Sequence, residues 1–174
     1  SYVRLKDFRL DQPKSVLVPT EDDIDSALEE LDTKFPIILK TLRGAGGVGV
    51  LFVESKRALD SLVQLIYKQD PETDILIQEY IKTDGDIRVI IVGDNIVGTM
   101  KREVVEGDFR SNYTQGGGVK SYDLSEEEIR QCLIAAKAVD GDFVAVDFIP
   151  YKGKPYFLEV NSSPGTEGIE EANS

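Results

Sequence analysis

The apolar residues of this chain stand in short runs that end at glycine- or proline-centred turns, which limits it to short strands mixed with a few helices. The run at residues 87–92 is far too short to cross a bilayer, and it contains Arg88. Strands and helices do not alternate strictly, as they would in a parallel βαβ fold. The sequence therefore predicts an α+β fold with largely antiparallel sheets.

Helices are expected where apolar residues recur with helical spacing behind a capping residue, at residues 20–31, 55–69 and 125–139. Thr20 with Asp23 and Ser125 with Glu128 have the capping-box spacing, and Ser55 caps the middle helix. Strands are expected at residues 36–40, 50–54, 75–81, 86–92, 96–103, 143–150 and 155–160. The stretch 1–11 shows no clear period.

The composition excludes several classes of function. The chain has 174 residues, with 20 Lys and Arg against 32 Asp and Glu, so its net charge is −12. Such a chain repels polyanions, which argues against nucleic acid and anionic membrane surfaces as partners. It has no His and only Cys132, which excludes a Ser-His-Asp triad, His-ligated zinc and an internal disulfide. A metal must therefore be held by oxygen ligands, and a reduced thiol favours a cytoplasmic location.

A glycine-rich loop at residues 44–49 formally matches G-x-G-x-x-G. A Rossmann loop would open a helix here, but the following segment is strand-like. A Walker A loop would continue with Lys, and Val50 stands there instead. The loop is therefore interpreted as a flap between two strands that can lie close over phosphates through Gly44, Gly46, Gly47 and Gly49. An ordinary flexible hairpin is the alternative.

Lys40 ends the apolar strand just before this loop. A lysine in that position is a suitable point charge for an α- or β-phosphate. The alternative is a strand-end lysine whose amine simply reaches solvent.

The last predicted hairpin carries Asp147 on one strand and Glu159 and Asn161 on the other. A three-residue loop at 152–154 places Asp147 opposite Glu159, whereas a two-residue loop would put them on opposite faces. Facing carboxylates repel each other, and neither strand offers a basic residue within its apolar core. A divalent cation bound by these three side chains is the simplest resolution, and a solvent-facing acidic pair is the alternative.

Several motifs follow one another in a specific order: Lys40 before the glycine loop, Gln-Glu-Tyr-Ile at 78–81, Gly-Asp-Ile-Arg at 85–88, Glu-Gly-Asp-Phe-Arg-Ser-Asn at 106–112, Val-Asp at 146–147, Leu-Glu-Val-Asn at 158–161 and Ser-Pro-Gly at 163–165. From about residue 35 to residue 170 the chain closely resembles the ATP-grasp domain of the RimK-like ligases, typified by ribosomal protein S6 glutamate ligase.

The resemblance implies an ATP-grasp fold, in which two α+β lobes clasp ATP. It divides the chain into an N-terminal linker or lobe entry at 1–34, a glycine-flap lobe at 35–84 and a metal-binding lobe at 85–174. Members of the family carry a further N-terminal α/β domain that has no counterpart here, so we expect this chain to be an excised domain.

The resemblance also implies an ATP-dependent ligase that joins a carboxylate to an amine through an acyl-phosphate. The expected reaction adds glutamate to the C-terminus of a protein or peptide, with ATP as substrate and two Mg²⁺ or Mn²⁺ ions, in a parent protein that could be a homo-oligomer. A ligase acting on a small-molecule carboxylate and a nucleotide-binding module without catalysis are the alternatives. A calcium- or protein-binding β domain would leave Lys40 and Arg110 without a role.

Residue by residue, the resemblance implies that Lys40 contacts the ATP phosphates. The backbone of Glu79, together with Tyr80, would hold the adenine, and Asp86 would bind near the ribose. A nucleotide-binding segment is matched by Arg110, Ser111 and Asn112.

The metal ligands of the family are matched by Asp147, Glu159 and Asn161. Arg110 would act catalytically beside the γ-phosphate, and Arg88 would face an acceptor carboxylate or a catalytic anion. Lys101 and Arg102 would hold substrate or form ion pairs.

Overall fold

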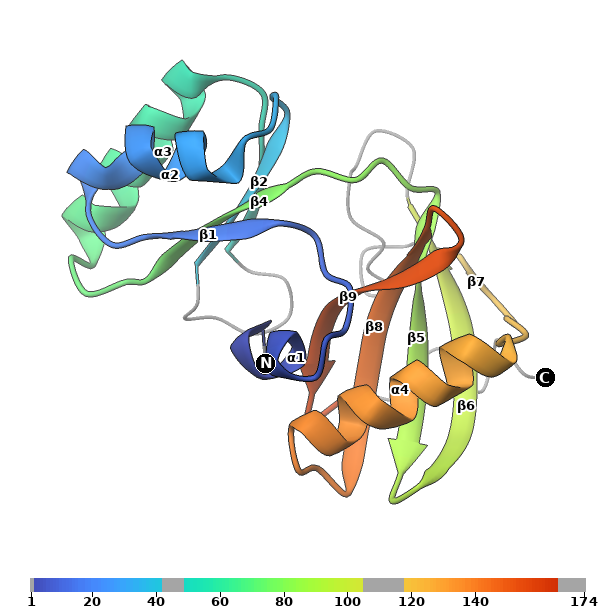
Figure 1. The fold of residues 1–174 in the computed structure, drawn as a ribbon. Coiled ribbons are helices and arrows are strands. Elements are labelled where there is room, and N and C mark those ends of the chain that lie inside the picture. The colour runs from blue at the N-terminus through green and yellow to red at the C-terminus, as the bar shows by residue number, and fades with distance from the viewer. Residues whose placement is uncertain (1, 42–48, 105–117, 166–174) are drawn as a thin grey trace. The chain divides into compact units, whose positions relative to one another are not determined.

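The structure is a computed structural model that describes residues 2–41, 49–104 and 118–165. The chain forms two units, coloured along the chain in Figure 1. We call Pro13–Lys82 the N-terminal unit, and Ser1–Gln12 together with Thr83–Ser174 the C-terminal unit. None of the helices among the described residues is long and apolar enough to span a membrane.

The N-terminal unit is a four-stranded antiparallel sheet in the order β1-β4-β2-β3. Its strands are β1 (Ser15–Val18), β2 (Ile37–Thr41), β3 (Val50–Val53) and β4 (Ile75–Glu79). A short 3₁₀ helix η1 (Glu21–Asp23) leads into α2 (Ile24–Leu31), and α3 (Lys56–Gln69) follows β3. Both α-helices lie on the same face of the sheet (Figure 1).

Alternation along the strands of this sheet separates its two faces. Ile37 and Leu39 pack with Leu59 and Val63 of α3 in the core beneath the helices. Ser55 caps α3 by accepting a hydrogen bond from the backbone N–H of Ala58, as predicted. The alternate residues of the same strands point to the opposite face of the sheet.

The C-terminal unit is a five-stranded antiparallel sheet in the order β7-β6-β5-β8-β9. Its strands are β5 (Gly85–Val92), β6 (Asn95–Glu103), β7 (Val119–Lys120), β8 (Phe143–Tyr151) and β9 (Lys154–Asn161). The helices α1 (Tyr2–Asp7) and α4 (Glu126–Ala138) cover one face (Figure 1). Ser125 and Glu128 form the predicted capping box at the start of α4.

Beneath α4, alternate residues of the central strands form the core of this unit. Ile87 and Val89 of β5 are fully buried, and the rings of Phe148 and Phe157 pack with their centroids 5.9 Å apart. Cys132 of α4 lies in the same core, as its helical neighbours indicated. The residues in between point to the other face, which carries the polar groups described below.

Cys132 makes the stability of the protein sensitive to alkaline pH. Burial, with a smaller contribution from the Glu128 carboxylate, raises the pKa of its thiol from 9.0 to about 12. The unfolded chain therefore loses this proton from about pH 9 while the folded protein keeps it. We expect the free energy of unfolding to fall by up to about 1.4 kcal/mol per pH unit in this window.

Cys132→Ala isolates this contribution, because the Tyr122 hydroxyl, whose pKa is also raised to about 12, titrates in both proteins. Urea unfolding at pH 8, 9, 10 and 11 should show that the free energy of unfolding falls less steeply with pH in Cys132→Ala than in the unmodified protein. Equal slopes in the two proteins would contradict the assignment.

Residues 1–34, the expected linker or lobe entry, are divided between the two units. The first part belongs to the C-terminal unit, where Leu5 of α1 is buried in the core, and the second part belongs to the N-terminal unit through β1 and α2. The reason is pairing over long sequence distances, since β1 forms its ladder with β4. The boundary between the units, after Lys82, lies close to the predicted one at 84.

The helix start predicted at Thr20 is also modified. The hydroxyl of Thr20 donates to the Asp23 carboxylate at 2.6 Å and makes no side-chain cap to the backbone. The first turn is therefore the 3₁₀ helix η1, and the α-helix begins only at Ile24. Helix α1 was not predicted from the sequence.

Candidate nucleotide and metal site

Four charged side chains lie together on the face of the five-stranded sheet that α4 does not cover. Asp86 and Arg88 are two residues apart on β5, so both point to this face. Arg102 of β6 stands directly opposite Asp86, and Asp147 of β8 stands directly opposite Arg88. The order of the strands thus brings together groups that are up to 61 positions apart, from Asp86 to Asp147.

These side chains form one chain of alternating charge. Arg88 grips Asp147 with two hydrogen bonds, from Nε to Oδ1 at 2.8 Å and from Nη2 to Oδ2 at 2.6 Å. Arg102 donates from Nη2 to the same Oδ2 of Asp147 at 3.0 Å. Arg102 also grips Asp86, from Nε to Oδ1 at 2.9 Å and from Nη2 to Oδ2. We call Arg88–Asp147–Arg102–Asp86 the ion-pair chain.

Asp86, Arg102 and Asp147 of the ion-pair chain are buried, and the pairing keeps Arg102 and Asp147 charged. Burial alone would raise the pKa of Asp147, which is 2% exposed, but the hydrogen bonds and charges of Arg88 and Arg102 outweigh it and lower the pKa. Burial likewise opposes the charge of Arg102, yet Asp147 and Asp86 raise the pKa of its guanidinium above the ordinary value. Buried charges that are paired and hydrogen-bonded in this way remain ionised.

Asp147 is neutralised by arginines within the protein, whereas the sequence suggested a divalent cation as the simplest resolution. The two strands of the β8–β9 hairpin indeed carry no basic partner, but the neighbouring strands β5 and β6 supply Arg88 and Arg102. The sequence signal was the Asp-x-Arg spacing of residues 86–88, which places opposite charges side by side on one strand face.

Asp147 does face Glu159, although the loop differs from the one that was assumed. The turn contains two residues, Lys152 and Gly153, and pairs Tyr151 with Lys154. A shift of register between Asp147 and Phe148 then brings Asp147 opposite Glu159. A β-bulge therefore restores the pairing that a two-residue loop alone would have prevented.

The donor set of this hairpin suits Mg²⁺ or Mn²⁺. It offers two carboxylates and the Asn161 amide oxygen, which also accepts the backbone N–H of Ser163 at 2.9 Å. Hard cations of this kind prefer such oxygens and complete their shell with water and phosphate. Among the described residues, no group of three or more His, Cys, Asp or Glu side chains is placed to hold a metal ion.

In the N-terminal unit, Lys40 lies on the sheet face turned away from α2 and α3. It alternates with Leu39, which faces the helices, and it stands between Leu76 of β4 and Val50 of β3. The same face carries the ring of Phe52, which meets the edge of Tyr80 at 5.0 Å between centroids. The apolar side chains of this face suit an aromatic base, and the Lys40 amine suits its phosphates.

The side chain of Glu79 is hydrogen-bonded within the N-terminal unit. Its Oε1 accepts a hydrogen bond from the backbone N–H of Lys14 at 2.8 Å, and its own N–H donates to the Lys14 carbonyl at 2.9 Å. The carboxylate thus anchors the segment that leads into β1. A nucleotide contact through the backbone of Glu79 stays a prediction.

Gly49 closes the strand pair at the described edge of the glycine loop. Its φ is +97°, a conformation that suits glycine, and a Cβ there would collide with Thr41 Oγ1. Its carbonyl accepts the Thr41 N–H at 2.9 Å. The other predicted site residues in loops lie outside the described residues: Gly44, Gly46, Gly47, Arg110, Ser111 and Asn112.

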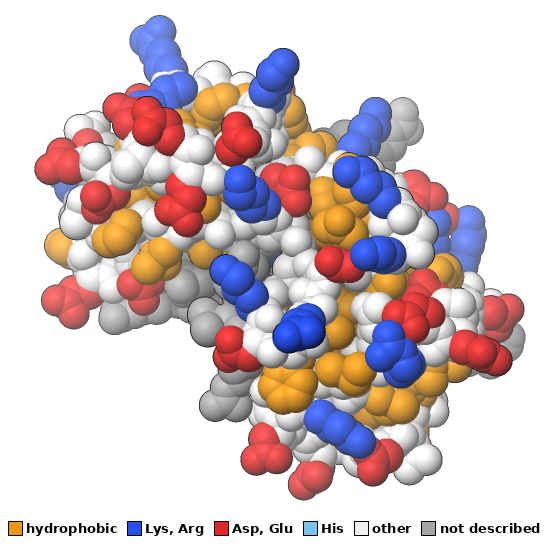
Figure 2. Space-filling model, in the orientation of Figure 1, with side chains coloured by type: hydrophobic (Ala, Val, Ile, Leu, Met, Phe, Trp, Pro, Cys, Tyr) orange, Lys and Arg blue, Asp and Glu red, His pale blue; other side chains and the backbone are white. Residues whose placement is uncertain are grey.

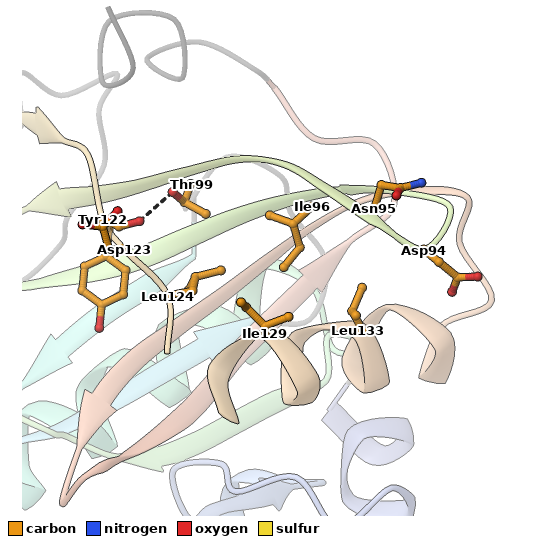
Figure 3. A pocket seen from close by; sticks show the side chains of 9 residues that line it. All are labelled: Asp94, Asn95, Ile96, Thr99, Tyr122, Asp123, Leu124, Ile129 and Leu133. Atoms are coloured by element: carbon orange, nitrogen blue, oxygen red, sulfur yellow. Dashed lines mark hydrogen bonds between the residues drawn. The ribbon is translucent and has the colours of Figure 1, made fainter. Parts of the chain in front are cut away.

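A cavity of about 370 Å³ lies elsewhere in the C-terminal unit, between β6 and α4. Figure 3 shows Ile96, Leu124, Ile129 and Leu133 lining it, with Thr99 hydrogen-bonded to the carbonyl of Tyr122. It contains none of the predicted site residues, and it opens beside the helix-covered face of the sheet. It is therefore not the candidate site.

Comparison with known proteins agrees with this geometry. The RimK-like ATP-grasp domain matches residues 3–174. A probable alpha-L-glutamate ligase of Marinobacter nauticus is 40% identical over 139 residues, which is 79% of this chain and 46% of the relative. Another, from Pseudoalteromonas translucida, is 36% identical over 97% of this chain and 58% of its own length. The chain thus spans about half the length of these relatives.

Solved structures show the same fold. The RimK domain ATP-grasp protein of Sphaerobacter thermophilus has a TM-score of 0.76 at 17% identity, over 99% of this chain and 61% of that one. The ATP-grasp ligase PsnB, complexed with a precursor variant, Mg and ADP, has a TM-score of 0.73 at 22% identity, over 98% of this chain and 51% of that one. The predicted α+β, ATP-grasp architecture is therefore confirmed, and the chain belongs to the RimK-like ATP-grasp family.

Proposed function

We propose that this chain supplies the ATP- and metal-binding part of a carboxylate–amine ligase that adds glutamate to the C-terminus of a protein or peptide. The observation that carries the proposal is the alignment of Asp147 with Glu159 on a polar sheet face, beside the partly buried charge of Arg88. The relatives named alpha-L-glutamate ligases support glutamate as the amine.

The proposed nucleotide contacts are those that the family resemblance implies. In the N-terminal unit, Lys40 and the glycine flap would contact the phosphates, and the backbone of Glu79 with Tyr80 would hold the adenine. The C-terminal unit would supply Asp86 near the ribose and the Arg110–Asn112 segment. The resemblance to the family supports these roles, and Lys40 and Asp86 each lie on the sheet face that the helices of their own unit do not cover.

Asp147, Glu159 and Asn161 would hold Mg²⁺ or Mn²⁺, with two ions proposed. A bound cation would neutralise charge on the phosphate oxygens. Arg88 and Arg110 add fixed positive charge, which suits phosphoryl transfer because that reaction depends on positioning and electrostatics. The chain needs no His for this chemistry.

The proposed reaction has two steps. An oxygen of the acceptor carboxylate attacks the γ-phosphorus, and the bond from that phosphorus to the ADP oxygen breaks, which leaves an acyl-phosphate. The amine nitrogen of glutamate then attacks the acyl carbon; the carbon–nitrogen bond forms as the bond to phosphate oxygen breaks. The amine loses its proton to solvent, and the products are an amide, ADP and phosphate.

Two of the similar structures bear on the identity of the acceptor. The PsnB structures hold a precursor peptide, which favours a peptide acceptor here. The similar fold of the VanG D-Ala:D-Ser ligase of Enterococcus faecalis, with a TM-score of 0.71 at 25% identity, favours a small-molecule carboxylate as the second candidate.

Charged side chains of both signs are interspersed on the face in Figure 2, in keeping with partners other than nucleic acid. We also propose a cytoplasmic location, given the thiol Cys132, and a homo-oligomeric parent protein.

Calorimetric titration with ADP, with and without Mg²⁺, tests the proposal. Binding that tightens with Mg²⁺ is the expected result, and phosphate release from ATP should then require both glutamate and a carboxylate acceptor. Binding of ADP that ignores Mg²⁺ would contradict the metal site, and ATP turnover without amide formation would favour the module without catalysis.

Glu159→Gln should weaken the Mg²⁺-dependent part of nucleotide binding by at least about tenfold, because it removes one proposed ligand charge. Glu159 is exposed, so the free energy of unfolding should change by no more than about 0.5 kcal/mol. Calorimetry and urea unfolding measure the two effects. Glu72→Gln, at another exposed carboxylate, is the matched control; equal effects of the two variants on Mg²⁺ dependence would remove Glu159 from the site.

A further inference from the structure

Arg102 is a buried arginine for which the proposed nucleotide and metal contacts have no use. Its side chain is 8% exposed, in the middle of the sheet between β5 and β7. An arginine without a partner inside the protein would extend its guanidinium to the surface, where water can solvate it. Its position therefore calls for an explanation in terms of what it contacts.

Arg102 contacts two carboxylates that have different proposed ligands: Asp86 would bind the nucleotide, and Asp147 would bind the metal. Its fork grips Asp86 through Nε and Nη2, and its Nη2 also donates to Asp147 at 3.0 Å. Arg88, by contrast, shows contacts to Asp147 alone among these carboxylates. Within the part of the chain that the structure describes, Arg102 is the side chain shown to bridge Asp86 and Asp147.

The backbone beneath this bridge is tightly constrained. A Cβ on Gly85 would collide with the Arg102 carbonyl oxygen, so the strands approach as closely as only glycine allows. The Thr83 hydroxyl donates to the Gly85 carbonyl at 2.5 Å and accepts its N–H at 3.2 Å. The start of β5, and with it Asp86, is therefore held in place against Arg102.

The charges of the ion-pair chain balance, with two arginines and two carboxylates. A cation entering next to Asp147 would therefore draw its additional attraction from Glu159, which lies opposite on β9. The fork of Arg102 limits the rotation of both carboxylates before any ligand arrives. Groups oriented in advance avoid a reorganisation cost on binding.

From these contacts we infer that Arg102 is a positioning residue that couples the metal site at Asp147 to the nucleotide site at Asp86. The inference rests on the proposed function and extends it, because Arg102 would act on both ligands without touching either. Binding of nucleotide at Asp86 would then favour the Asp147 orientation that binds the metal, and the reverse.

Arg102→Lys tests this coupling. It keeps the positive charge and most of the stem, but it loses the planar fork that holds two carboxylates at once. The readout is the ratio of ADP affinities measured by calorimetry with and without Mg²⁺. We expect this ratio to fall at least about tenfold, the range found for groups that orient metal ligands.

Lys101→Gln is the matched control. Lys101 is the neighbouring residue on β6, points to the other face, and pairs with the exposed Asp84 at 2.7 Å. Its removal should leave the ratio unchanged. A purely structural role for Arg102 would lower the melting temperature of Arg102→Lys without changing the ratio.

A measurement on the unmodified protein covers the case in which Arg102→Lys does not fold. Carboxyl ¹³C NMR should show the Asp147 signal shifting when ADP is added without Mg²⁺, since Arg102 transmits the change at Asp86. An Asp147 signal that ignores ADP would overturn the inference.

The outcomes separate the two proposals. If the unmodified protein binds ADP without any effect of Mg²⁺, the proposed function fails and the inference with it. If Mg²⁺ tightens ADP binding in the unmodified protein and equally in Arg102→Lys, only the inference fails. A lower ratio in Arg102→Lys, with an unchanged ratio in Lys101→Gln, supports it.

Discussion

Asp147→Asn is expected to destabilise the C-terminal unit by about 3–5 kcal/mol, the cost of leaving a buried charge without its partner. Asparagine has nearly the same shape, so the loss is electrostatic. Arg88, whose side chain is 15% exposed, would lose the carboxylate that accepts both of its hydrogen bonds. Arg102 would keep Asp86. The same variant should also abolish the Mg²⁺ dependence of nucleotide binding.

Thermal and urea unfolding measure the stability loss, which corresponds to about 6–20 °C in melting temperature at about 2–4 °C per kcal/mol. Arg88→Met combined with Asp147→Asn is the informative control, because it removes both charges of the pair. The double variant should recover part of the lost stability. A single variant as stable as the unmodified protein would show that the ion-pair chain does not hold this sheet together.

Arg110→Ala is expected to lower ligase turnover by about 100- to 1,000-fold, the usual cost of removing one group that stabilises charge in a transition state. Nucleotide binding should change far less, because Lys40 and the proposed metal would still hold the phosphates. The expectation rests on the proposed function, since Arg110 lies outside the described residues.

Phosphate release at saturating ATP, glutamate and acceptor measures this effect, and ADP titration measures the affinity in parallel. Arg57→Ala, at an exposed arginine of α3, controls for loss of a positive charge in general. Turnover that matches the control would remove Arg110 from the mechanism. An equal loss of turnover and ADP affinity would make it a binding residue instead.

Local signals predicted most of the secondary structure correctly. Ser55 and Ser125 mark helix starts because a cap is formed within four residues of sequence, and most strands were predicted because each buries apolar side chains. The short strands β1 and β7 were not predicted from the sequence. Helix α1 escaped because it has only six residues and depends on packing in the C-terminal core. Thr20 failed as a cap because Asp23 competes for its hydroxyl.

For the candidate site too, some features can be predicted from the sequence and others depend on the tertiary structure. The residue types at 147, 159 and 161 are enough to point to an oxygen-ligand metal site, and the motif order identifies the family. The facing of Asp147 and Glu159, however, depends on a bulge, which changes register without any strong mark in the sequence.

The sequence by itself determined most of the strands, the helices capped by Ser55 and Ser125, the family and the side chains available for chemistry, because each follows from local pattern or from motif order. Only the tertiary structure decided that Arg88 and Arg102 neutralise Asp147, and that residues 1–34 are shared between two units. Both results depend on which strands become neighbours. Strand order is set by the packing of the whole sheet, and a local stretch of sequence carries little information about it.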